Sequence, residues 1–262
     1  MLKKEIKKSL SSFIQLTSFE KIDNKNYIRQ DQFLMDIAKE IILGHTIAQY
    51  LNKQELQKLF DNLKFHHYHH HQVVYRHQQK SGDIFLILQG SLQLSWHAPD
   101  GRQIIHQFLP AGCMINIIPV ITGLPMMHDH IAHHTTIIAT IPGKIFLELT
   151  QSNAKVSFEI LKMIACRSHF ILDDIYYHKT RSLRVRLARQ LFFLLNYFSH
   201  QRTNSPLTIK LSQENFAELL QTTRQSISKE LLWLAQQSIA EVKYNQIHIL
   251  DIEKLETLAY SL

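Results

Sequence analysis

The chain has 262 residues, 45% of them hydrophobic, so it can bury a sizeable core and divide into two domains. No run of about 18 apolar residues could span a bilayer, and the lysine-rich start, Met1 to Lys8, lacks the apolar core of a secretory signal, which predicts a cytoplasmic protein with no membrane partner. Two cysteines, Cys113 and Cys166, are too few for a disulfide framework or a four-cysteine iron–sulfur cluster within one chain.

Residues 1–51 are predicted to form a helical extension, because apolar side chains such as Leu34, Ile37 and Ile41 recur at helical spacing. From about Phe65 to Ile141 the pattern changes to short β-rich runs separated by turns that contain glycine or proline. Several short strands with such turns predict a compact antiparallel β-roll over residues 52–150.

Seventeen histidines are unusual for this length, and several of them crowd between His66 and His71. Neutral imidazoles at short spacing can chelate zinc, nickel or copper. No carboxylate or cysteine completes a recognisable site, so the alternative is a histidine-biased polar strand or loop. The sequence therefore leaves any metal site unknown.

A long helix is predicted from about Asn153 to His178, within a segment that covers residues 151–180. In one heptad frame Ile164, Ile171 and Ile175 lie along a single seam, which predicts a dimer interface. The polar members of that seam leave open the alternative that the helix packs on its own β-domain.

The C-terminal segment, residues 181–262, begins with a second predicted helix from Ser182 to about Phe198. Its leucines are expected to face inward and its arginines outward; these arginines are Arg184, Arg186 and Arg189. His200 to Pro206 is the loop that we expect to follow this helix.

The stretch from Leu211 to Leu250 predicts two short helices, a tight turn between them and a β-hairpin after them, which is the arrangement of a winged helix-turn-helix DNA reader. Ser212 and Thr223 are good N-caps for the two helices. The predicted DNA-contacting residues occupy the turn and the start of the second helix: Thr222, Thr223, Arg224, Gln225, Ser228 and Lys229. The alternative is an ordinary helical hairpin with a solvated polar face.

The charge distribution favours the DNA reader over the ordinary hairpin. Between Lys179 and Lys229 there are nine basic residues and two acidic ones, an excess equal to the formal net charge of +7 of the whole chain. A basic field confined to one segment indicates contact with a phosphate backbone.

The order of β-roll, long helix and winged helix resembles the Crp/Fnr family of bacterial transcription regulators. The matching segments are SGDIFLILQGSLQL from Ser81, PDGRQIIHQFLPAG from Pro99, RVRLARQLFFLL from Arg184 and LSQENFAELLQTTRQSISKELLWL from Leu211. The resemblance covers roughly Leu56 to Leu262 and implies an α+β protein that binds a palindromic site on double-stranded DNA as a homodimer. It also implies RNA polymerase as a partner.

Members of the family that bind cyclic AMP carry a Gly-Glu pair and, soon afterward, an Arg followed by Ser or Thr. Asn116-Ile117 and Met126-Met127 stand at the matching positions, and the run from Met114 to Met127 has no charged residue. A phosphate diester would lie there without a cation, which costs several kcal/mol. The run suits a hydrophobic effector in a pocket formed by Ile115, Ile117, Met126 and Met127, and the alternative is a filled β-roll core that senses nothing.

Other sensors and an enzyme are alternatives to this interpretation. The family's oxygen sensors need an N-terminal cysteine cluster, which is absent, and its haem sensors can use a histidine, for which His77, His97 and His106 are equal candidates. A cupin-like metal enzyme would use a pair such as His69 and His71, but no glutamate lies between Asp61 and Glu148. We therefore expect no catalytic residue and no tightly bound cofactor.

The residues of the predicted recognition helix depart from the family's usual pattern of Arg, Glu and a second Arg. Arg224 keeps the guanine-reading fork, whereas Gln225 offers an amide that can pair with adenine, where glutamate would accept from cytosine. Lys229 is a point donor to a guanine or a phosphate. The half-site is expected to differ from the family's usual sequence.

Overall fold

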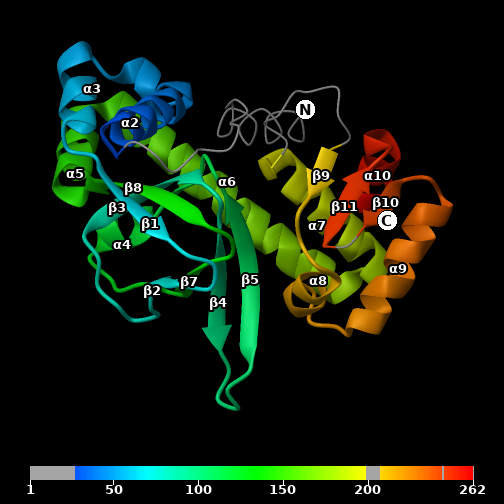
Figure 1. Cartoon of the computed structure of the whole chain (residues 1–262). Helices are drawn as coiled ribbons and strands as arrows, with labels where there is room; N and C mark the ends of the chain where they lie inside the picture. The colour runs from blue at the N-terminus through cyan, green and yellow to red at the C-terminus, as the bar shows by residue number, and fades with distance from the viewer. Residues whose placement is uncertain (1–26, 199–206, 244, 262) are drawn as a thin grey trace. The chain divides into compact units, whose positions relative to one another are not determined.

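The computed structural model describes residues 27–198, 207–243 and 245–261. They form two compact units (Figure 1). The β-roll unit comprises residues up to 95 and 108–167, and the reader unit comprises residues 96–107 and 168 onward. Both combine helices with antiparallel sheet, so the predicted α+β class is confirmed. The predicted loop His200 to Pro206 and the first half of the predicted N-terminal extension lie outside the described residues.

Two four-stranded sheets build the β-roll, with strand orders β1-β8-β3-β6 and β2-β7-β4-β5. The strands are β1 (Lys64–Tyr68), β2 (Val73–Tyr75), β3 (Asp83–Gln89), β4 (Ser91–His97), β5 (Gln103–Pro110), β6 (Met114–Ile115), β7 (Asp129–Ala132) and β8 (Thr136–Pro142). Gly90 makes the turn between β3 and β4 with a φ of 79°, and a Cβ there would lie 2.4 Å from the carbonyl oxygen of Thr135. Only glycine fits this turn without strain.

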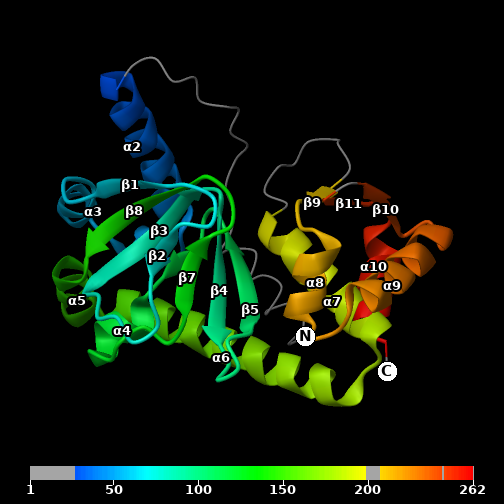
Figure 2. The same cartoon turned by 60° about the horizontal axis from the view of Figure 1, so that its bottom comes forward.

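Helices cover the β-roll and explain why β3 is apolar from Ile84 to Leu88. They are α2 (Tyr27–Gly44), the 3-10 helix η1 (Ala48–Tyr50), α3 (Lys53–Phe60), α4 (Ile117–Thr122) and α5 (Gly143–Ser152). The residues from Ile84 to Leu88 on β3 are all buried, because α2 and α5 pack on one face while Phe85 on the other face stacks on Tyr75 of β2. Helices α3 and α5 lie side by side (Figure 2).

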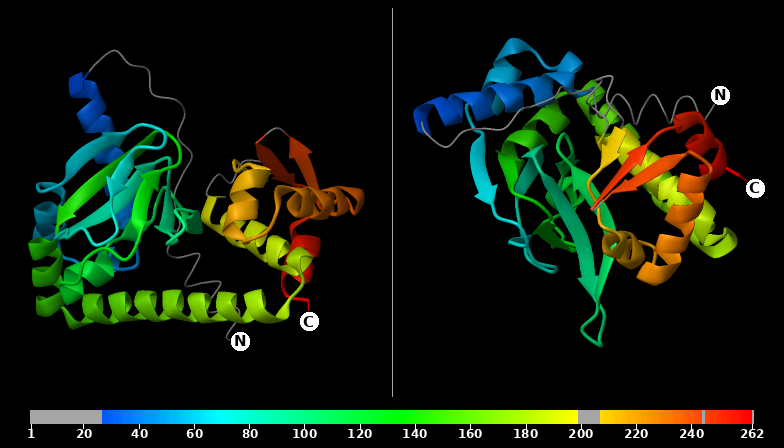
Figure 3. Two further views of the ribbon diagram at one scale, coloured as in Figure 1. Left: turned by 90° about the horizontal axis from the view of Figure 1, so that it is seen from below. Right: turned by 45° about the vertical axis from the view of Figure 1, so that its right-hand side comes forward.

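The predicted long helix is present as α6 (Ala154–Thr180), the extended helix in the left view of Figure 3. Its residues up to Arg167 belong to the β-roll unit and those from Ser168 belong to the reader unit. The second predicted helix is α7 (Leu183–Phe198), which buries Leu187, Leu191 and Leu194.

The reader unit contains the predicted helix pair and hairpin. Its further elements are α8 (Gln213–Leu219), α9 (Arg224–Gln236), β9 (Leu207–Ile209), β10 (Ala240–Lys243), β11 (Gln246–Ile249) and α10 (Ile252–Ala259). Strands β10 and β11 are called the wing below, and β9 joins them in a three-stranded sheet. Sequence patterns did not predict β9 or α10, because both are short and gain their stability by packing on β11 and α7.

Candidate nucleic-acid interface

The first helix of the pair is fixed at its N-terminus by a capping box. The backbone amide of Asn215 donates to the Ser212 hydroxyl at 3.1 Å, and the side-chain oxygen of Asn215 accepts from the Ser212 amide at 3.0 Å. Phe216 and Leu219 are buried beneath α8. The chain then turns through Gln221, which has a φ of 51°. The predicted N-cap is confirmed, and it fixes the residue at which α8 begins.

The second helix, α9, presents one continuous exposed stripe. Thr223 caps it by accepting from the Ser226 amide at 3.2 Å, as predicted. Ile227, Leu231 and Leu234 are fully buried. The exposed residues recur with the period of the helix: Arg224, Gln225, Ser228, Lys229, Leu232, Ala235 and Gln236. Four of the six residues predicted to contact DNA therefore share this stripe; Thr223 is exposed at its start, and Thr222 is half-buried in the turn.

The opposite side of α9 is held by an arginine of α7. The Nε of Arg184 donates to Glu230 Oε2 at 2.7 Å, and its guanidinium lies 4.0 Å from the centre of the Trp233 ring. A charge-assisted bond combined with a cation–π contact fixes the rotation of the helix. The exposed stripe is therefore a preorganised surface.

The prediction that the arginines of α7 face outward was wrong. Arg184 binds α9, Arg186 donates to the carbonyl of Leu220, and the buried Arg189 pairs with Asp173 of α6. Burial lowers the pKa of Arg186, and the guanidinium keeps its charge as arginines in proteins do. Three of the nine basic residues of this segment thus bind other parts of the reader unit, because α7 contacts α6, α9 and α10.

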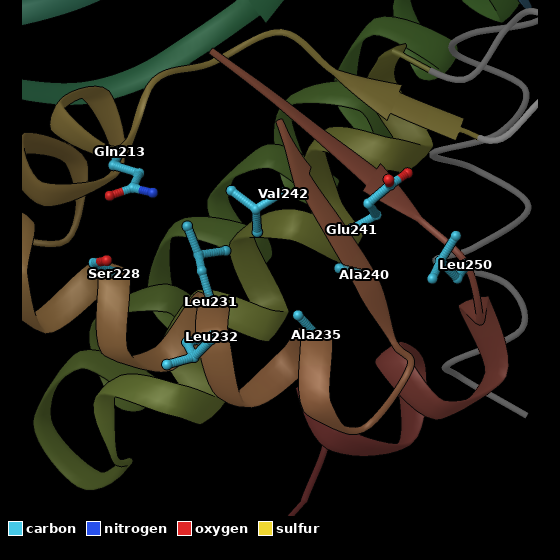
Figure 4. Close-up of a pocket in the computed structure, with 9 residues that line it drawn as sticks. All are labelled: Gln213, Ser228, Leu231, Leu232, Ala235, Ala240, Glu241, Val242 and Leu250. Carbon is cyan, nitrogen blue, oxygen red and sulfur yellow. The ribbon is translucent and has the colours of Figure 1, made fainter. Parts of the chain in front are cut away.

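A shallow groove of about 430 Å³ lies between α9 and the wing (Figure 4). Its lining is mostly apolar, and it consists of Gln213, Ser228, Leu231, Leu232, Ala235, Ala240, Glu241, Val242 and Leu250. At the end of β10, Lys243 pairs with Glu241 at 3.2 Å. Sequence reasoning missed this groove, because its walls are brought together by the return of the chain from α9 to β10.

The predicted dimer residues lie on α6 with different exposures. Ile171 and Ile175 are 44% and 47% exposed, whereas Ile164 is half-buried against the core of the β-roll unit. Leu172, which the heptad frame omitted, is 67% exposed. Ile171, Leu172 and Ile175 thus form an exposed apolar stripe on α6.

The predicted effector residues differ in their exposure to solvent. Ile115, Ile117 and Met126 are buried in the β-roll, but Met127 is 56% exposed. The short helix α4 turns Ile117 inward and its neighbour Ile118 outward. Asn116, at the N-cap of α4, donates to the carbonyl of Asp83 at 2.5 Å. The fold also brings Arg167 of α6 to the carbonyl of Met114 at 2.6 Å, a cation that the sequence run alone could not reveal.

Several histidine rings lie close together in the β-roll. The rings of His70, His71, His133 and His134 cluster at the ends of β1 and β7, with centroids 3.8 Å apart for His70 and His71. Among the described residues, no group of three or more His, Cys, Asp or Glu could hold a metal ion. Of the three haem candidates, His77 and His97 are exposed, and His106 packs on Trp96, where burial lowers its pKa.

No helix within the described ranges is long and apolar enough to cross a membrane.

Comparisons with known proteins match each unit separately. Residues 65–153 match the cyclic nucleotide-binding domain family, and residues 185–258 match the Crp-like helix-turn-helix domain family. The transcriptional regulator LdrP of Thermus thermophilus is 31% identical over 83 residues, which are 32% of this chain and 43% of LdrP. The match therefore spans less than half the length of that relative.

Solved structures show the same fold. FixK2 from Bradyrhizobium japonicum has a TM-score of 0.66 at 17% identity, over 76% of this chain and 98% of FixK2. A transcriptional regulator of the CRP/FNR family from Thermus thermophilus has a TM-score of 0.56 at 16% identity, over 76% of this chain and 99% of the other. The likeness confirms a β-roll, a long helix and a winged helix-turn-helix in one chain.

Proposed function

Because the chain belongs to the Crp/Fnr family of transcriptional regulators, we propose that it binds a specific palindromic DNA site as a homodimer and reads base edges with α9. The observation that carries this proposal is the exposed stripe on α9. It begins with Arg224 and Gln225 at the N-terminal end of a helix whose opposite side is locked by Arg184. Recognition helices present this end to the major groove.

The side chains of the stripe can be assigned to two roles, reading of bases by Arg224 and Gln225 and contact with a phosphate or a base by Lys229. A guanidinium can donate two bonds to O6 and N7 of guanine, and a primary amide can bond N6 and N7 of adenine. We assign these roles to Arg224 and Gln225. Ser228 and Lys229 stand one turn further along and supply a hydroxyl and a point charge. Thr222 and Thr223 complete the interface through the turn.

Changing Arg224 to Ala tests the assignment. The variant should lose about 1–3 kcal/mol on the selected site and much less on random DNA, because only the specific complex contains the guanine pair. Lys254→Ala is the matched control, since Lys254 is an exposed cation of α10 that pairs with Asp251, the N-cap of that helix. Fluorescence anisotropy on both duplexes measures the difference. Equal losses on specific and random DNA would remove Arg224 from base reading.

We propose that two chains pair through the exposed apolar stripe of α6. Ile171, Leu172 and Ile175 supply its apolar surface, and a two-fold pair places one recognition helix on each half-site. A regulator bound in this way acts on transcription by contacting RNA polymerase or by excluding it from the promoter, and transcription in vitro distinguishes the two.

We propose further that the β-roll does not bind cyclic AMP. Ile117 is buried in the core, the Asn116 amide is bound to Asp83, and the Arg167 guanidinium donates to the Met114 carbonyl. A cyclic phosphate would have to displace one of these contacts to find a partner. Calorimetry with cyclic AMP should give no heat of binding, and micromolar affinity would contradict the proposal. A hydrophobic effector remains the alternative regulatory input, and thermal-shift measurements with acyl and aromatic ligands would detect it.

A further inference from the structure

One residue of the exposed stripe on α9 does not match its neighbours. Leu232 is 60% exposed, although it stands between polar or small side chains on the same face. Helical geometry places it one turn beyond Ser228 and two turns beyond Gln225. It therefore extends the row of proposed DNA contacts with an aliphatic side chain.

The packing of α9 keeps Leu232 at the surface. Leu231 and Leu234 on either side of it are 1% and 0% exposed and fill the core positions. The bond from Arg184 to Glu230 and its contact with Trp233 prevent the helix from turning Leu232 inward. An aliphatic side chain held in water gains free energy when a partner covers it.

The surroundings of Leu232 continue this apolar surface toward the wing. Figure 4 shows Leu232, Ser228 and Ala235 on α9, with Val242 of β10 also lining the groove. Ser228 and Leu232 thus belong both to the groove and to the exposed stripe. DNA that contacts the polar residues of the stripe therefore also faces an apolar surface one turn further along α9.

We infer that Leu232 contacts the 5-methyl group of a thymine and makes that base part of the recognised half-site. This inference rests on the proposed function. Thymine is the one ordinary base that shows a methyl group in the major groove, and aliphatic contact is the way that proteins recognise it. Seven residues of helix separate Gln225 from Leu232, about 10 Å or roughly three base pairs of DNA. The thymine should therefore lie about three base pairs from the base read by Gln225.

Replacing thymine by deoxyuridine, one position at a time, removes a single methyl group from the selected site. The wild-type protein should lose about fourfold in affinity at one thymine of each half-site, the worth of one buried methyl group. Leu232→Ala should bind the thymine site more weakly than the wild type does. Its affinity should not fall further when that thymine is replaced by deoxyuridine. Leu232→Met should keep the preference, because it restores an aliphatic contact.

Leu250→Ala is the matched control, since Leu250 lines the same groove at 56% exposure but does not belong to α9. It should keep the fourfold sensitivity to deoxyuridine. The slope of log affinity against log salt should be unchanged in Leu232→Ala, because a methyl contact releases no counterion.

Equal sensitivity to deoxyuridine in the wild type and Leu232→Ala, or none in either, would overturn the inference while the proposed function stands. Equal losses of DNA affinity in Leu232→Ala and Leu250→Ala would also overturn it, because Leu232 would then have no role beyond that of the groove as a whole. A chain that selects no DNA site at all would overturn the proposed function itself.

Discussion

The reader unit and the β-roll unit present their ligand-facing segments in opposite ways. On α9 the stripe opens with a charged and an amide side chain and stays polar until Leu232. In the β-roll the run from Met114 to Met127 has no charge, and it is divided between the core and the surface. A polar stripe on an otherwise apolar helix has one stable orientation, toward solvent, whereas an apolar run can be core or surface.

The largest effect should come from disrupting the helix that belongs to both units. Ile171→Asp places a carboxylate in the proposed dimer interface, so dimers should dissociate and affinity for the palindromic site should fall at least ~100-fold. Light scattering and anisotropy measure the two changes. Ile118→Asp is the control, because Ile118 is equally exposed at 46% but lies on α4. An Ile171→Asp protein that stays dimeric would place the interface elsewhere.

The β-roll unit should be sensitive to acid. Burial lowers the pKa of His45 to about 4 and that of His130 to about 4, below the value of 6.5 expected in the unfolded chain. As the pH falls through 6.5, both imidazoles become protonated in the unfolded chain. In the folded chain they stay neutral until the pH approaches 4. Each histidine should therefore remove about 2 kcal/mol of the free energy of unfolding between about pH 7 and pH 5.

Urea melts at the two pH values measure this loss. His130→Gln should have a shallower dependence on pH than the wild type, whatever its stability at neutral pH. His97→Gln, at an exposed position, is the control. The same dependence in all three proteins would mean that the imidazole of His130 becomes protonated in the folded state.

Smaller effects should separate the structural cations of the reader unit from those that bind DNA. Arg184→Ala removes the bond to Glu230 and the contact with Trp233, so it should lower the free energy of unfolding by about 1–2 kcal/mol. Lys229→Ala should leave stability unchanged and reduce the salt slope of DNA binding by about one if Lys229 binds a phosphate. A loss of stability in Lys229→Ala and a smaller salt slope in Arg184→Ala would mean that Lys229 is the structural cation and Arg184 the DNA contact.

The sequence predicted the long helix, the helix after it, the helix pair and the wing, because periodic apolar residues and caps determine these elements locally. Ser212 and Thr223 cap the helices they were expected to cap, and the core leucines of α7 are buried. It failed where an environment depends on distant segments. The arginines of α7 bind α6, α9 and the residue that ends α8, and Arg167 reaches β6, contacts that no local pattern encodes.

The exposure of the apolar residues between Met114 and Met127 was also not predictable from their sequence. The uncharged run was predicted to line a pocket, and the structure adds that a residue with left-handed backbone, Asn116, starts a short helix within it. That helix exposes Ile118 and Ile121 while it buries Ile117 and Val120. Hydrophobicity alone could not assign these neighbours to opposite sides.

Selection of binding sites from random DNA with the wild type and Gln225→Glu tests the central claim, base reading by α9, most directly. The wild type should select a palindrome with an adenine opposite Gln225, because the amide accepts from N6 and donates to N7. Gln225→Glu should shift that position toward a base pair that offers the N4 donor of cytosine and leave the rest of the half-site unchanged. The same consensus for both proteins would contradict direct reading by Gln225.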